Sequence, residues 1–123
     1  MTPDEVINEL EAIANAKDFV FHAYELTDSW AASNAGFEVV EPVLRFMEKY
    51  PSIDYGTPGP LVHFVERFFG KGYEAELLES IKRNPTPHTV GMLNRLINGM
   101  KSHEQELPHN AGGAWLASRS REH

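Results

Sequence analysis

The 123-residue sequence predicts an all-α fold of about six short amphipathic helices, stacked as antiparallel pairs in a bundle or a short HEAT-like α-solenoid. Apolar residues recur at helical spacing, and no stretch of useful length alternates between apolar and polar residues as a strand would. Glycine and proline interrupt the pattern and leave connections of mostly two to six residues. We expect one helical domain over residues 1–100, followed by a loosely docked or flexible tail over residues 101–123.

Three helices are expected in the first half of the chain, at residues 3–16, 18–32 and 38–50. Thr2, Pro3 and Glu5 supply an N-cap, a proline at the first helical position and a capping box for the first helix. The second helix has an apolar stripe at i, i+4, i+7 and i+11, widened by three further residues: Phe19, Ala23, Leu26 and Trp30, with Val20, Tyr24 and Thr27. Pro51 ends the third helix.

Three more helices are expected at residues 60–69, 73–83 and 87–100. A loop over residues 51–60, with three prolines and two glycines, precedes the first of them. Pro60 and Pro87 each suit the first turn of a helix. The sixth helix is expected to bury an apolar face made of Val90, Leu93, Ile97 and Met100.

The net charge of −7 lies in the first half of the chain. Residues 1–50 hold ten acidic and three basic side chains, whereas acids and bases balance in the remainder. A negative surface speeds association with a basic protein and argues against nucleic acid as the partner. The alternative is a solvated acidic face that keeps a small protein in solution.

Composition excludes several classes of site. Because the chain has no cysteine, it can form no disulfide, thiolate metal site or cysteine nucleophile. The N-terminus is acidic where a signal peptide would be basic, and no apolar run approaches the length of a membrane span. The sequence therefore predicts a soluble cytoplasmic protein that makes no membrane contact.

Two His-x-x-Glu pairs, His22/Glu25 and His63/Glu66, have the i, i+3 spacing that places an imidazole and a carboxylate on one helix face. Metal sites and general bases use such pairs, so a metal-dependent enzyme is one hypothesis. Helical geometry places both pairs opposite the apolar stripe, however, where they face water. A partner contact or a plain solvated surface is therefore favoured, and we expect no metal, cofactor or enzymatic activity.

Over residues 38–100 the chain resembles small all-helical bacterial immunity proteins of polymorphic-toxin and contact-dependent inhibition systems. The strings PGPLVH (58–63) and LNRLIN (93–98) are the most specific parts of this resemblance. The resemblance implies a cytoplasmic protein without enzymatic activity that binds one cognate toxin domain and blocks its active site or its access to the target. It also implies a further amphipathic helix after Asn98, and the sequence of residues 101–123 departs from that expectation.

The acidic first half suits a nuclease toxin, whose nucleic-acid-binding face must be basic. Our predicted binding surface comprises polar residues of the second and third helices and two residues of the fourth. These residues are Asp18, His22, Glu25, Asp28, Glu38, Glu41, His63 and Glu66. The alternative is a helical scaffold or adaptor protein that binds a peptide or protein partner unrelated to toxins, through apolar contacts in a groove between helix pairs.

Overall fold

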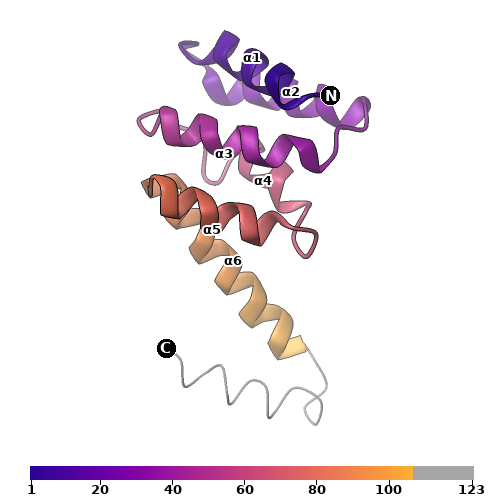
Figure 1. The fold of residues 1–123 in the computed structure, drawn as a ribbon, viewed down its shortest axis with the longest axis vertical. Coiled ribbons are helices and arrows are strands. Elements are labelled where there is room, and N and C mark those ends of the chain that lie inside the picture. Colours follow the sequence, from indigo (N-terminus) through magenta and orange to yellow (C-terminus); the bar gives the residue numbers. More distant parts are fainter. Residues whose placement is uncertain (107–123) are drawn as a thin grey trace. The chain divides into compact units, whose positions relative to one another are not determined.

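The computed structural model describes the backbone of residues 1–106 and the side chains of residues 1–100. Residues 1–106 contain six α-helices, a short 3-10 helix and no strand, so the predicted all-α fold is confirmed (Figure 1). The elements are α1 (Pro3–Ile13), α2 (Phe19–Ala32), η1 (Phe37–Val39), α3 (Val40–Lys49), α4 (Pro60–Glu66), α5 (Tyr73–Arg83) and α6 (Pro87–Glu106). The part of the predicted tail beyond residue 106 lies outside the described residues.

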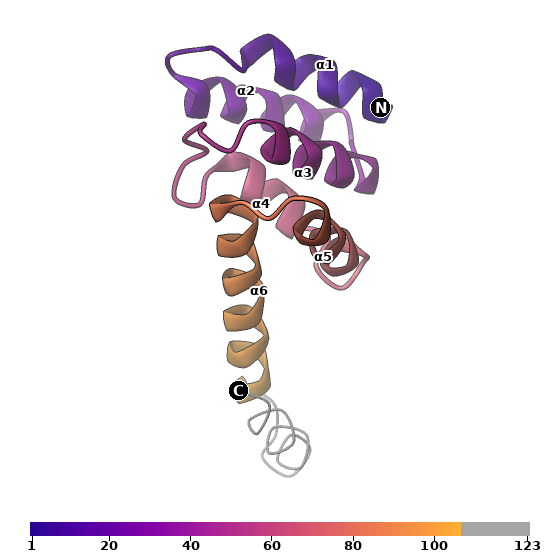
Figure 2. The same cartoon turned by 60° about the vertical axis from the view of Figure 1, so that its left-hand side comes forward.

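Residues 1–92 form one compact unit, and a second unit begins at Leu93 within α6. In the first unit, α1 packs on α3 and α3 packs on α5, while α2 packs on α4. The chain reverses direction between α1 and α2 and again between α3 and α4, as Figure 2 shows. These helices therefore form two layers, α1/α3/α5 and α2/α4, which is the arrangement of stacked antiparallel pairs in an α-solenoid.

Local signals place most helix boundaries where the sequence predicts them. The capping box of α1 is formed, since the Glu5 amide donates to the Thr2 hydroxyl and the Thr2 amide donates to the Glu5 carboxylate. Two helices end three residues earlier than expected, α1 at Ile13 and α4 at Glu66, whereas α6 continues to Glu106, six residues into the expected tail. After α4 the amides of residues 67–69 bond three residues back, which forms tight turns in place of a further α-helical turn.

The interior of the first unit is built from apolar side chains that all these helices contribute. Fully buried examples are Val6, Leu10, Trp30, Val43, Leu44, Met47, Leu61, Val65 and Leu77. Phe19 at the start of α2 stacks on Phe46, with ring centroids 6.1 Å apart, and meets the Tyr55 ring edge-on at 5.3 Å. These contacts fix the first turn of α2 against α3 and the loop before α4.

The predicted buried face of α6 is wrong at Val90. Val90 is 43% exposed, whereas Thr89 and Met92, in the same part of the helix, are buried. The reason is local: the hydroxyls of Thr86 and Thr89 accept hydrogen bonds from each other's amides, at 3.2 and 3.1 Å, which places both threonines inside the protein. The inward face of the helix is therefore rotated away from Val90.

Candidate functional site

The exposed side of α2 carries two aromatic rings beside two carboxylates. Phe21 is 60% exposed and Tyr24 is 50% exposed, and Glu25 and Asp28 are also exposed. Their spacing of i, i+3, i+4 and i+7 puts all four side chains on one face of the helix. We call Phe21, Tyr24, Glu25 and Asp28 the α2 face.

Two of the four residues of the α2 face, Phe21 and Tyr24, are not part of the binding surface predicted from the sequence. Tyr24 was expected to widen the apolar stripe of α2, which is wrong, because the inward side of the helix is filled by Phe19, Ala23, Thr27 and Trp30. Phe21 is not among the predicted site residues. Its position four residues before Glu25 and seven before Asp28 was the available signal.

Three acidic side chains of the first half, those of Glu9, Glu11 and Glu48, join different elements of the fold. Glu9 accepts a hydrogen bond from the Trp30 indole at 2.7 Å, which joins α1 to α2. Glu11 accepts from Lys49 and from Tyr50, and these hydrogen bonds lower the pKa of its carboxyl. Much of the negative charge is therefore committed to contacts within the protein.

The Glu48 side chain is largely buried, with 11% of its surface exposed. It accepts a 2.6 Å hydrogen bond from Ser80 and is paired with Arg83 at 2.8 Å, which joins α3 to α5. Burial raises the pKa of the Glu48 carboxyl, but the hydrogen bonds from Arg83 and Ser80 outweigh burial and lower it.

The acidic side chains of α2 do not join this helix to another described element. The Asp28 carboxylate makes no hydrogen bond or ion pair with any described residue, and the same is true of the carboxylate of Asp18, which precedes the helix without a side-chain cap. Glu25 contacts only His22 among the described side chains, with 3.3 Å between its Oε1 atom and His22 Nδ1. Carboxylates that the fold does not use are available to a partner.

The structure divides the predicted binding surface between the two layers. His63 and Glu66 lie on α4, which packs against α2, so they belong to the same layer as Asp18, His22, Glu25 and Asp28. The two remaining residues, on η1 and α3, are occupied locally: Glu38 accepts from the Gly36 amide, and Glu41 pairs with Arg45 at 3.1 Å.

The two His-x-x-Glu pairs do not converge. His63 Nδ1 lies 3.7 Å from Glu66 Oε1, and His22 forms its separate pair on α2. Among the described residues, no three histidine or acidic side chains are grouped so that they could hold a metal ion. Each pair can hold an imidazole in place, and within residues 1–100 neither pair has a further histidine or acidic side chain grouped with it.

A groove of about 220 Å³ runs between α2 and α4. It brings Asp28 and Tyr24 of the α2 face together with His63, and it adds Arg67, which the prediction did not include. The Arg67 guanidinium lies 4.7 Å from the centre of the Phe64 ring. The groove therefore carries both signs of charge.

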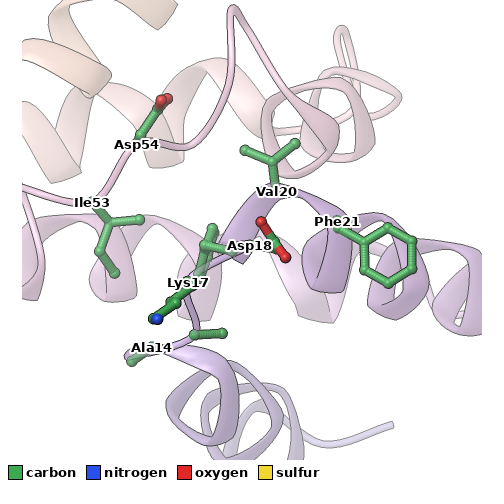
Figure 3. A pocket seen from close by; sticks show the side chains of 9 residues that line it. Ala14, Lys17, Asp18, Val20, Phe21, Ile53 and Asp54 are labelled. Carbon is green, nitrogen blue, oxygen red and sulfur yellow. The ribbon is translucent and has the colours of Figure 1, made fainter.

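A second hollow, of about 380 Å³, lies at the start of α2 (Figure 3). Asp18, Val20 and Phe21 line it from one side, and Ile53 and Asp54 of the loop before α4 line it from the other. Phe21 thus belongs both to the α2 face and to this hollow.

The shape of that loop depends on Gly59. Its φ of 91° lies in the left-handed region, and a Cβ atom there would meet the Tyr55 carbonyl oxygen at 1.7 Å. The Asp54 carboxylate supports the same loop by accepting the Gly56 amide at 2.9 Å. Ile53 and Asp54 are therefore presented to the hollow by a loop of defined conformation.

Comparisons with protein-family models, with curated proteins and with solved structures each found nothing similar. Within residues 1–106, no helix is both long and apolar enough to cross a membrane. The function is therefore inferred from the residues and their arrangement.

Proposed function

We propose that this chain binds a basic protein partner through the α2 face, and that it acts as an immunity protein that neutralises a cognate bacterial toxin domain. One observation carries the proposal: Phe21 and Tyr24 are exposed beside Asp28, whose carboxylate pairs with no described residue, and beside Glu25, whose carboxylate pairs only with the neighbouring His22 among the described residues. Aromatic side chains are enriched at protein interfaces, and they contribute much of the binding energy at such surfaces.

The two residue types of the face have separate tasks. Phe21 and Tyr24 gain from leaving water when a partner covers them, which supplies affinity. Glu25 and Asp28 attract a positively charged surface from a distance, which raises the rate of association and selects against acidic partners.

The immunity role is supported by the resemblance over residues 38–100 and by the acidic charge of the first half. A nuclease toxin must carry a basic face for its nucleic acid. An acidic helix face with aromatic anchors is suited to cover such a surface and to keep the nucleic acid away from it.

Growth of cells that express the toxin tests this role. The C-terminal domain of the protein encoded directly upstream is expressed alone, with this chain, and with a Glu25→Lys/Asp28→Lys variant. We expect growth arrest by the domain alone, rescue by the wild-type chain and no rescue by the double variant. Glu79→Lys, an exposed charge reversal on α5, is the matched control and retains rescue. A harmless upstream domain, or arrest that the wild-type chain does not relieve, would contradict the proposal.

The groove between α2 and α4 favours a second candidate function, a helical adaptor that binds a peptide. Apolar Phe64 and Pro60 line this groove beside Asp28 and Arg67, so its charges largely cancel. An adaptor that uses the groove predicts binding with little salt dependence, whereas the acidic α2 face predicts association that slows as salt is added.

A further inference from the structure

We propose that the toxin domain places an acidic side chain in the groove between α2 and α4, where its carboxylate pairs with Arg67. A basic side chain beside it on the toxin domain pairs with Asp28. The inference rests on the proposed function, because it requires a partner that covers α2. It names Arg67 as the residue that distinguishes the cognate toxin domain from other basic proteins.

The groove is continuous with the α2 face. Tyr24 and Asp28 belong to both, so a partner that covers the face also reaches the groove. The groove has a volume of about 220 Å³. Pockets for small molecules usually measure about 300–1,000 Å³, so this groove suits one or two side chains of a protein partner better than a separate ligand.

Arg67 brings a positive charge to the groove from the α4 side. Its side chain is exposed, and its guanidinium group lies 4.7 Å from the centre of the buried Phe64 ring. Among residues 1–100, the guanidinium group makes no hydrogen bond or ion pair. The ring contact therefore holds the guanidinium group at the groove while its N–H groups stay available to a partner.

The charges of the groove determine which groups of a partner can cover it. A toxin domain that presented only basic side chains here would bring like charges together at Arg67, which disfavours binding. A carboxylate instead pairs with the planar guanidinium group through two parallel hydrogen bonds. Asp28 lines the same groove, so the acidic side chain needs a basic neighbour that pairs with Asp28.

This contact gives the surface a means of selecting one partner. The acidic side chains of the α2 face attract any basic surface. Arg67 repels a basic surface that has no carboxylate at the matching position. Specific interfaces commonly combine an attractive and a repulsive element in this way, so Arg67 is assigned to specificity.

The direction of the effect of Arg67→Glu tests the inference. A uniformly basic partner would bind this variant more tightly than the wild type, because the surface beside α2 becomes more negative. We expect the opposite: calorimetry with the upstream-encoded toxin domain should show binding weakened by at least about tenfold. Lys82→Glu, the same change of charge at an exposed site on α5, is the matched control and should not weaken binding. Equal or tighter binding by Arg67→Glu would overturn the proposal.

A charge swap identifies the matching residue of the toxin domain. Each acidic residue of that domain is changed to lysine in turn. We expect one such variant to bind the wild-type chain about tenfold more weakly, and to recover most of the lost affinity when it is paired with Arg67→Glu. If the wild-type chain does not bind the toxin domain, the proposed function is wrong. If it binds and no swap restores affinity, only the Arg67 contact is wrong.

Discussion

Phe19 and Phe21 are the same residue type, two positions apart on α2, and we expect opposite consequences when each is changed to alanine. Phe19 is 6% exposed and contacts Phe46 and Tyr55, whereas Phe21 is 60% exposed. Removal of a buried phenylalanine side chain costs about 3–5 kcal/mol of the free energy of unfolding. Phe19→Ala should therefore lose a large share of the roughly 5–15 kcal/mol that stabilises a small domain.

The cost at Phe21 is much smaller. Complete burial of a phenylalanine is worth about 1.5–3 kcal/mol, and less than half of this ring is covered. Because alanine also favours the helix by up to about 0.7 kcal/mol, Phe21→Ala should change the free energy of unfolding by less than about 1 kcal/mol. Binding of the toxin domain should nevertheless fall by at least about tenfold, since Phe21 is one of the two aromatic anchors.

Urea unfolding followed by circular dichroism measures both variants against the wild type. A loss of stability in Phe21→Ala as large as in Phe19→Ala would show that the Phe21 ring is needed for packing. The exposure of Phe21 would then no longer support the proposal that the α2 face binds a partner. A Phe19→Ala variant as stable as the wild type would contradict the contacts described for the core.

Other substitutions test contacts that position the site. Glu48→Gln should cost about 1–2 kcal/mol at neutral pH, because Arg83 and Ser80 lose a charged acceptor; urea unfolding measures this loss. Since the pKa of the Glu48 carboxyl is lowered from 4.5, its charge stabilises the folded state above that pH and ceases to do so as the pH falls below it. Melting temperatures of the wild type and of Glu48→Gln should therefore converge as the solution is acidified, and a constant difference would contradict this. Gly59→Ala should cost about 2–4 kcal/mol in thermal unfolding, because its Cβ atom collides with the Tyr55 carbonyl, whereas Gly70→Ala, with open space around it, should cost about 1 kcal/mol.

The helices were predictable because their signals are local. The capping box of Thr2 and Glu5 and the prolines that open α4 and α6 act within one turn of helix, so they mark boundaries in the sequence itself. The buried face of α6 was not predicted, because the Thr86–Thr89 pair turns two polar side chains inward. The spacing of apolar residues alone does not predict that two threonines are buried.

The candidate site was predictable in part for a related reason. The sequence gives the total charge, but the fold determines which carboxylates form contacts within the protein. Glu11 pairs with Lys49, 38 residues away in the chain, and Glu48 pairs with Arg83, 35 residues away. Among the described residues, no side chain from a distant part of the chain pairs with Glu25 or Asp28. Phe21 belongs to neither the predicted apolar stripe nor the predicted polar face of this helix, so the sequence pattern gives it no role.

The affinity of the chain for the upstream-encoded toxin domain tests the central claim most directly. Calorimetry at low and high salt compares the wild type with Glu25→Lys/Asp28→Lys and with the Glu79→Lys control. If the α2 face binds a basic partner, the double reversal weakens binding by at least about tenfold, the control binds as the wild type does, and wild-type affinity falls as salt is added. Equal affinities for all three chains would contradict the claim that the α2 face is the binding surface.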